Sequence, residues 1–246
     1  MTRYRCIAFD AVGTLITPSP APGEIYFQAA RRFGSRLELD EITRRFKLAF
    51  RSSELQDAAA AGEFGPVTSE SRERERWQQV VAAVIDDISD CAACFEHLFS
   101  HFSQPGSWRC FDDVPEVLAR LVADGYSLAI ASNFDRRLHH VCDAIPALKK
   151  IELRIISSEV GHRKPGCRFF EALVTGAGCA PHEILMVGDD AANDVMGARQ
   201  AGLGAVLINR REKPGPGEPR PNEIGSLAEL FRLLEDPSPP ASIRVD

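Results

Sequence analysis

The sequence predicts an α/β protein: a doubly wound parallel sheet with a helical cap domain inserted after its first strand. Two observations lead to this prediction. Short apolar runs alternate with amphipathic, helix-length segments from residue 106 onward, which is the pattern of a parallel sheet covered by helices. A long stretch before them has helical periodicity only, so it interrupts the sheet.

Five apolar runs are the predicted strands of the core. They cover residues 6–9, 128–131, 151–156, 184–187 and 205–208. The segments between or after them have helical patterns, over residues 114–121, from residue 135 onward, and over 169–176, 194–202 and 227–234. Strands that alternate with helices in this way favour a Rossmann-like core with helices on both faces of the sheet.

The inserted segment is bounded by turn chemistry at both ends. Pro18, Pro20 and Pro22 mark its start, and Pro105-Gly106 marks its end. Between them lies a clear apolar stripe at helical spacing, formed by Trp77, Val80, Val81, Val84, Ile85 and Ile88. The predicted boundaries are 1–17 and 106–235 for the core, 18–105 for the cap and 236–246 for a disordered, proline-rich tail.

Composition excludes several classes of protein. The net charge of −6 argues against a nucleic-acid-binding protein, because neutralising phosphates requires a basic surface. No apolar run reaches the length of a membrane span, so we expect no membrane insertion. Seven scattered cysteines do not suggest a disulfide framework, and we expect reduced thiols in the cytoplasm. A monomer or homodimer is expected.

Polar clusters follow the predicted strands where ligands bind in such sheets. The four clusters are Asp10 to Thr14, Ser132-Asn133, Lys164, and Asp189 to Asp194. Asp10 can attack phosphorus and form an aspartyl-phosphate. A carboxylate repels a phosphate dianion, so a divalent cation is needed between them. The hard oxygens of Asp10 and Asp189 suit Mg²⁺.

Other groups complete a phosphate site. The main-chain carbonyl of Val12 is a candidate third metal ligand, since its oxygen does not depend on the side chain. Lys164 supplies a positive charge to phosphate oxygens. The Ser132 hydroxyl and the N–H groups of the turn after Asp10 can donate to the same oxygens. Each cluster alone is also compatible with an ordinary cap, turn or solvated lysine; the order and spacing of all four favour the site.

Together these segments resemble the four motifs of the haloacid dehalogenase-like hydrolase superfamily. The stretch 132–138, with Val12 and Trp77, resembles a subgroup typified by the rhythmically expressed gene 2 product. The resemblance implies an enzyme whose cofactor is Mg²⁺ and whose partner is a small phosphorylated metabolite. The implied roles are nucleophile and metal ligand for Asp10, metal ligands for Asp189 and Asp194, catalysis and phosphate binding for Lys164, and substrate binding for Thr14, Ser132 and Asn133. Asp194 would alternatively orient Lys164, and the role of Asp190 stays open.

Val12 departs from the family pattern. The superfamily has a second aspartate there, which protonates the leaving group and then activates water, and valine cannot transfer a proton. Three interpretations stay open. The protein is a slow phosphatase, or one for good leaving groups such as acyl phosphates. Another residue (Asp135, Glu24 or Tyr26) replaces the acid. Or the site binds phosphate compounds without turnover, as in a regulatory protein.

Two other chemistries of the superfamily are less favoured. In a 2-haloacid dehalogenase, the acids at 189, 190 and 194 would repel the substrate carboxylate. A phosphonatase would need a cap lysine as Schiff base, and the candidate, Lys47, is expected on a solvated helix face. Arg136 and Arg137 are likewise expected to be solvated helix charges. The leading prediction is therefore a Mg²⁺-dependent phosphohydrolase.

Overall fold

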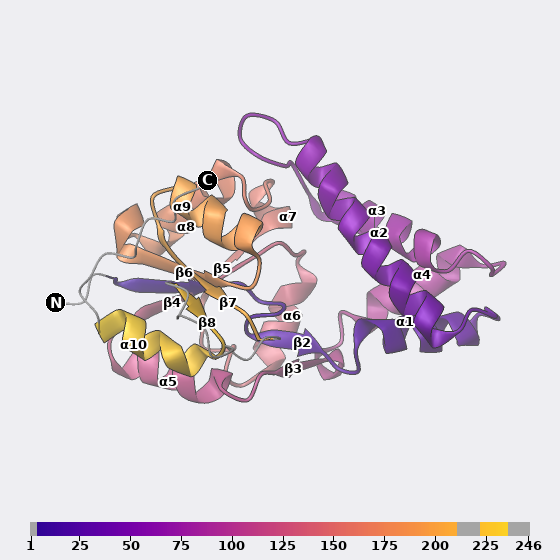
Figure 1. Ribbon diagram of the computed structural model, residues 1–246, viewed down its shortest axis with the longest axis horizontal. Coiled ribbons are helices and arrows are strands. Elements are labelled where there is room, and N and C mark those ends of the chain that lie inside the picture. The colour runs from indigo at the N-terminus through magenta and orange to yellow at the C-terminus, as the bar shows by residue number, and fades with distance from the viewer. Residues whose placement is uncertain (1–3, 211–221, 236–246) are drawn as a thin grey trace.

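The computed structural model describes residues 4–210 and 222–235, and the predicted tail lies outside them. Its core is a six-stranded sheet in which every neighbouring pair is parallel (Figure 1). In spatial order the strands are β5 (Leu153–Ile156), β4 (Ser127–Ser132), β1 (Cys6–Phe9), β6 (Ile184–Gly188), β7 (Gly204–Ile208) and β8 (Glu223–Ile224). The predicted α/β class with a parallel sheet is confirmed.

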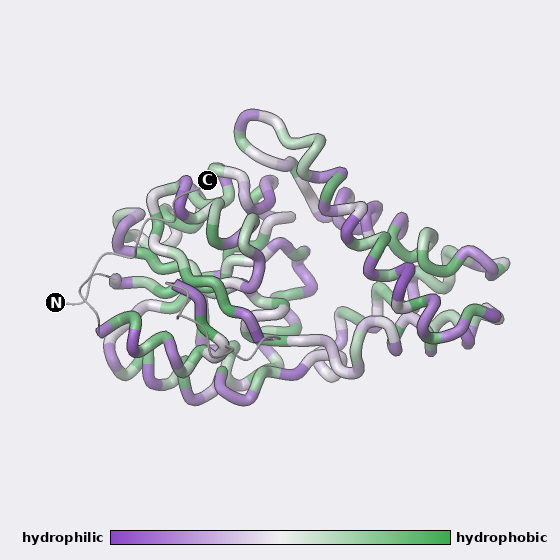
Figure 2. Tube along the Cα trace, in the orientation of Figure 1, coloured by the Kyte–Doolittle hydropathy of each residue, from purple (hydrophilic) through white to green (hydrophobic). Residues whose placement is uncertain are grey.

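Helices cover both faces of this sheet because its strands are apolar on both sides. In β1, Ile7 and Phe9 join one buried cluster, and Cys6 and Ala8 join another on the opposite face. The first cluster includes side chains of α5 (Val114–Ala123), α6 (Arg137–Ala144) and α10 (Leu230–Glu235). The second includes α8 (Cys167–Ala177) and α9 (Gly197–Gln200). Figure 2 shows the strands as a hydrophobic centre between these layers.

The strand order reverses direction at β1. From β1 the chain reaches β4 and then β5 on one side, and it later returns to β6 and β7 on the other side. The carboxyl ends of β1, β4 and β6 therefore meet where the connections diverge. In open α/β sheets, this switch point is where ligands bind.

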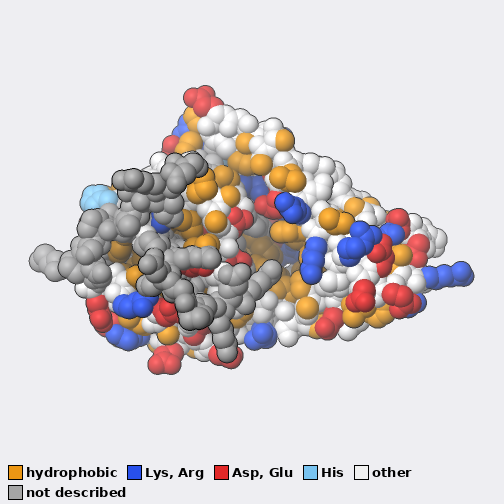
Figure 3. All heavy atoms as spheres, in the orientation of Figure 1, with side chains coloured by type: hydrophobic (Ala, Val, Ile, Leu, Met, Phe, Trp, Pro, Cys, Tyr) orange, Lys and Arg blue, Asp and Glu red, His pale blue; other side chains and the backbone are white. Residues whose placement is uncertain are grey.

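Four helices lie in the inserted segment that was predicted to be a cap, and they have an apolar cluster of their own, which includes Tyr26, Val80, Val84, Phe95 and Leu98. They are α1 (Pro22–Arg32), α2 (Leu39–Ala59), α3 (Glu70–Val84) and α4 (Cys91–His101). Trp77 packs against this cluster, as the predicted stripe requires. On the face shown in Figure 3, acidic and basic side chains are interspersed over the cap.

Two short strands connect the cap to the core. β2 (Ile16–Pro18) pairs antiparallel with β3 (Trp108–Cys110), so the chain enters and leaves the cap at adjacent positions (Figure 1). The sequence did not predict this ribbon, because three residues are too few to establish an alternating pattern. Among the residues described, no helix is both long enough and apolar enough to cross a membrane.

Two helices differ from their predicted bounds. The stripe predicted up to Ile88 ends with α3 at Val84. The helix predicted over 194–202 begins earlier, as a π-helical turn at Ala191–Met196 that leads into α9. It begins there because the Asp190 carboxylate accepts hydrogen bonds from the N–H groups of Ala192 and Asn193.

Candidate active site

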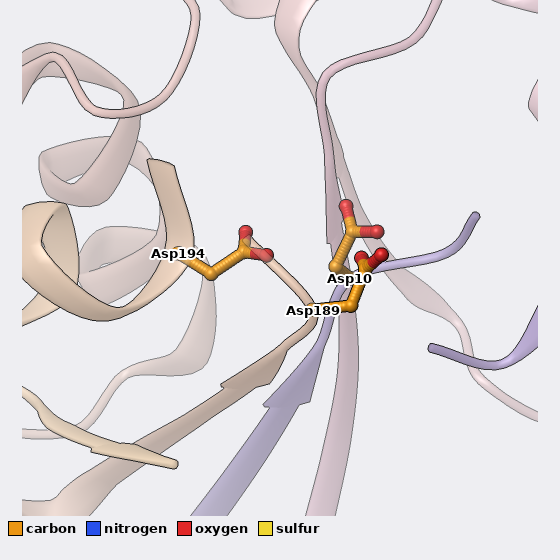
Figure 4. A group of neighbouring side chains, drawn as sticks. All are labelled: Asp10, Asp189 and Asp194. Carbon is orange, nitrogen blue, oxygen red and sulfur yellow. The ribbon is translucent and has the colours of Figure 1, made fainter. Parts of the chain in front are cut away.

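Two aspartates lie side by side at the switch point, directly after β1 and β6 (Figure 4). The N–H of Asp10 donates to the carbonyl of Val187 at 2.9 Å, which extends the ladder between these strands. Gly13 then turns the chain with a φ of +92°, and a Cβ at this position would overlap the Asp189 carboxylate. The glycine of the predicted turn is therefore what allows the loop to pass so close to Asp189.

Lys164 lies beside Asp10 and donates hydrogen bonds to three acceptors. Its Nζ is 2.7 Å from Asp10 Oδ1, 2.6 Å from Asp194 Oδ1 and 2.7 Å from the carbonyl oxygen of Ala131. Burial alone would lower the pKa of Lys164, but the charges of Asp10 and Asp194 outweigh it and raise the pKa. The ammonium group therefore stays charged and fixes the orientation of both carboxylates.

The third acid, Asp194, points toward the same centre from the π-helical turn (Figure 4). Its Oδ2 accepts a hydrogen bond from the N–H of Asp190 at 3.0 Å. Burial is the main cause that raises the pKa of Asp194, and the charge of Asp10 adds to it. Asp189 as a whole is exposed, but neighbouring protein atoms that surround its carboxyl group raise its pKa, and the charges of Asp10 and Asp194 add to this effect.

These carboxylates fit a divalent cation. Oxygens of Asp10, Asp189 and Asp194 all lie within 4.8 Å of one another. Three carboxylates gather here, and among the described residues only the ammonium group of Lys164 bonds to two of them, so the cluster carries more negative than positive charge when all three acids are ionised. A set of hard oxygen donors with unbalanced negative charge is the environment that Mg²⁺ requires. The donor set therefore agrees with the predicted metal.

The other predicted ligands, Ser132, Asn133 and Thr14, differ from one another in where they lie and what they contact. Ser132 is buried at the carboxyl end of β4, next to the carbonyl that Lys164 contacts. Asn133 accepts from the N–H of Lys164 at 2.8 Å and donates to its carbonyl at 3.1 Å, so it positions the lysine. Thr14 is fully buried in the loop after Asp10, and its contact with substrate stays a prediction.

Two of the three candidate replacement acids are engaged elsewhere. Tyr26 is buried in the cap, with its ring 4.8 Å from that of Phe46, and burial raises its pKa. Asp135 is buried, and its two oxygens accept from the Arg137 guanidinium at 2.8 and 2.7 Å. Glu24 is exposed on α1. Val12 itself packs against the apolar cluster under the loop.

Two arginines have roles that sequence reasoning missed. Arg137, expected to be solvated, is instead largely buried: its guanidinium lies 3.6 Å from the ring centre of Phe99 in the cap and donates to the Phe99 carbonyl at 3.0 Å. Arg210 donates to the carbonyl of Thr14 at 2.7 and 3.1 Å, and so holds the loop that follows Asp10. Each contact joins segments far apart in the chain, so no local pattern indicates it.

We expect Gly188→Ala to weaken the site, because a Cβ there would overlap the Asp194 carboxylate and separate it from Lys164. The thermal stabilisation produced by added Mg²⁺ should become smaller than in the wild type. Gly106→Ala is the matched control, since its Cβ would meet open space. An unchanged response of Gly188→Ala to Mg²⁺ would mean that the position of Asp194 does not matter for the metal.

Comparison with known proteins agrees with this geometry. The sequence profile of the haloacid dehalogenase-like hydrolase family matches residues 4–202. The chain belongs to this family. As a haloacid dehalogenase-like hydrolase, it is 27% identical to human haloacid dehalogenase-like hydrolase domain-containing protein 3, over 95% of this chain and 94% of the human one. It is 23% identical to the Drosophila melanogaster rhythmically expressed gene 2 protein, over 96% and 97% of the two chains. The resemblance to that subgroup is confirmed.

This hydrolase also has relatives named as phosphatases. It is 44% identical to the phosphoserine phosphatase of Thermus thermophilus over 80 residues, which is 32% of each chain. Among solved structures, the haloacid dehalogenase-like phosphatase of Thermococcus onnurineus has a TM-score of 0.64, with 24% identity and coverage of 94% of this chain and 98% of that one. The Bacillus subtilis hydrolase YfnB has a TM-score of 0.74, with 17% identity and coverage of 95% and 100%. These structures share the fold of the hydrolase.

Proposed function

We propose that the protein is a Mg²⁺-dependent phosphohydrolase that acts on a small phosphorylated metabolite through an aspartyl-phosphate on Asp10. The observation that carries this proposal is the buried Lys164, held between Asp10 and Asp194 while Asp189 faces Asp10 from the next strand. A charged lysine beside two strand-end carboxylates would suit an anionic substrate once Mg²⁺ is bound to those carboxylates. The phosphatases among its relatives support phosphate as that anion.

In the proposed reaction, a carboxylate oxygen of Asp10 attacks phosphorus while the bond from phosphorus to the leaving oxygen breaks. Lys164 holds Asp10 Oδ1, which fixes the carboxylate for attack, and Asp194 and the Ala131 carbonyl hold Lys164 in turn. Ser132 and the N–H groups of the loop after Asp10 would donate to phosphate oxygens. Water then hydrolyses the acyl phosphate to release inorganic phosphate and free Asp10.

Mg²⁺ would be held by Asp10, Asp189, Asp194 and the main-chain carbonyl of Val12. When bound, it supplies positive charge that reduces the repulsion between the carboxylates and the phosphate.

Val12 decides which substrates suit this site. It offers no proton, so a leaving group must depart as a stable anion or be protonated by water. Acyl phosphates meet this condition, because a carboxylate is a good leaving group. Alkyl phosphates do not, and we propose that they turn over slowly.

One observation also favours a second candidate function, a phosphate-binding regulatory protein. With Mg²⁺ held by the three acids, the site could bind a phosphate compound whether or not a general acid is present, and neither Tyr26 nor Asp135 is free to serve as that acid. By contrast, Lys47 is exposed on α2, as expected of a solvated lysine, which gives no support to Schiff-base chemistry.

Hydrolysis of acetyl phosphate and p-nitrophenyl phosphate, with Mg²⁺ and with EDTA, tests the proposal. We expect Mg²⁺-dependent turnover by the wild type and loss of it in Asp10→Asn, because an amide is not a nucleophile. Asp112→Asn, at an exposed position of the core, is the matched control. Turnover that survives in Asp10→Asn would exclude the aspartyl-phosphate mechanism. Phosphate binding without any turnover would instead support the regulatory protein.

A further inference from the structure

A buried ion network joins the cap to the segment that carries the active-site lysine. Arg163, which precedes Lys164, has a side chain only 4% exposed. Its guanidinium bonds to Glu73 of α3, whose side chain is 2% exposed, and lies 3.2 Å from Glu54 and 3.4 Å from Asp57 of α2. An arginine of the core thus has its ionic partners in the cap.

Main-chain hydrogen bonds also join the cap to the core at this place. The N–H of Arg163 donates to the carbonyl of Pro66 at 2.9 Å, and the N–H of Thr68 donates to the carbonyl of Gly161 at 3.0 Å. The loop between α2 and α3 therefore pairs with residues 161–163. On its other side, Lys164 is bonded to Asn133 of the core. The lysine thus lies between a contact to the cap and a contact to the sheet.

The same network reaches the segment that carries Asp194. Glu54, which pairs with Arg163, also accepts from Nδ2 of Asn193 at 3.4 Å. Asn193 precedes Asp194 and donates to Asp190 Oδ2 at 2.8 Å. A single carboxylate of the cap therefore contacts the two segments that supply the Lys164–Asp194 pair.

The ion pairs of Arg163 depend on the contact between the cap and the core. Three carboxylates (Glu54, Asp57 and Glu73) share two arginines, Arg163 and the largely buried Arg76. Moving the cap away would separate Arg163 from all three carboxylates. Removing one partner of a buried ion pair leaves the other charge uncompensated. The network therefore favours one docked arrangement of cap and core over intermediate ones.

We propose that Arg163 is a positioning residue that couples docking of the cap to the placement of Lys164 and of the loop from Asp190 to Asp194. It does not touch the reacting atoms. It holds the segment of Lys164 directly, and it reaches the loop of residues 190–194 through Glu54. The kinetic part of this inference rests on the proposed phosphohydrolase function, whereas the coupling between cap and core does not.

Amide hydrogen exchange of the full chain tests the coupling without substrate. In Arg163→Met, we expect exchange to become about tenfold faster or more in two places, residues 161–164 and residues 190–194. Glu54→Gln should produce a smaller increase at 190–194. It also serves as the deciding variant if Arg163→Met does not fold. Arg44→Met is the matched control, because it removes an ion pair exposed on α2 and confined to that helix.

Kinetics test the positioning role. With acetyl phosphate and Mg²⁺, we expect Arg163→Met to lower kcat roughly 10- to 100-fold. Arg163→Lys, which keeps the charge, should recover part of this loss, and Arg44→Met should match the wild type. An increase in KM with an unchanged kcat would overturn the positioning role.

The two hypotheses fail differently. If the wild type has no turnover, the proposed function fails, and exchange at 190–194 still decides the coupling. If exchange in Arg163→Met rises at residues 161–164 but stays unchanged at 190–194, Arg163 only anchors the cap and the coupling is refuted. If Arg163→Met does not fold, an unchanged rate at 190–194 in Glu54→Gln refutes it equally.

Discussion

Replacing Lys164 with methionine is expected to destabilise the protein by about 3–5 kcal/mol, the usual cost of removing one partner from a buried ion pair. The reason is the placement of the ammonium group, which lies between the two buried carboxylates of Asp10 and Asp194. Methionine has a similar length and no charge, so both acids would face each other without a cation. The measurement is the free energy of unfolding from denaturant titration in EDTA.

Added Mg²⁺ should restore part of the stability that Lys164→Met loses, since a ligand that binds only the folded state stabilises it. The Mg²⁺-induced gain should exceed that of the wild type, because the variant's cluster of three acids has lost its protein cation. Lys47→Met is the matched control, an exposed lysine changed in the same way. Equal stability of Lys164→Met and Lys47→Met would show that the Asp10–Lys164–Asp194 contacts contribute nothing.

Replacing Val12 with aspartate is expected to raise Mg²⁺-dependent turnover of alkyl phosphates by about 10²-fold or more, the contribution of a positioned general acid. The position suits the change, since Val12 is only partly buried at the edge of its apolar cluster and lies two residues after Asp10. The gain should be much smaller for p-nitrophenyl phosphate, whose leaving group needs no proton.

Val12→Asn is the appropriate comparison, because it has the size and polarity of aspartate but no proton to transfer. A gain in Val12→Asp alone would identify the missing acid as the limit on the rate. No gain for either class of substrate would show that a different residue already acts as the acid, or that another part of the site limits turnover.

Features that depend on residues close together in the sequence were predictable from it. Parallel strands buried on both faces appear as apolar runs, so β4 and β6 begin and end within one residue of their predicted bounds. Because ligand groups follow such strands, the sequence alone assigned Asp10 and Asp189 to one site. In the structure, oxygens of the two carboxylates lie within 4.8 Å of each other. The glycine that permits this approach, Gly13, was visible only as a turn signal.

Features that depend on distant pairs were not predictable. Arg163 and its partner Glu73 are 90 residues apart, and each alone resembles an ordinary surface charge. The same holds for Arg137, whose burial follows from stacking on Phe99 of the cap. The resemblance implied substrate binding for Asn133, and the contact of its amide with the main chain of Lys164, 31 residues away, was not foreseen. Local periodicity contains no information on such contacts.

The ribbon of β2 and β3 has a consequence for the order of folding. Sheet formation requires Cys6 to meet Ser127, a long loop to close. The cap helices pack on one another, and once Pro18 pairs with Trp108 the loop that remains is roughly a quarter as long. Two halvings of loop length reduce the entropic cost of closure by about 1.2 kcal/mol. A cap that folds first would therefore remove most of the loop-closure cost that its own insertion adds to the central strand pairing.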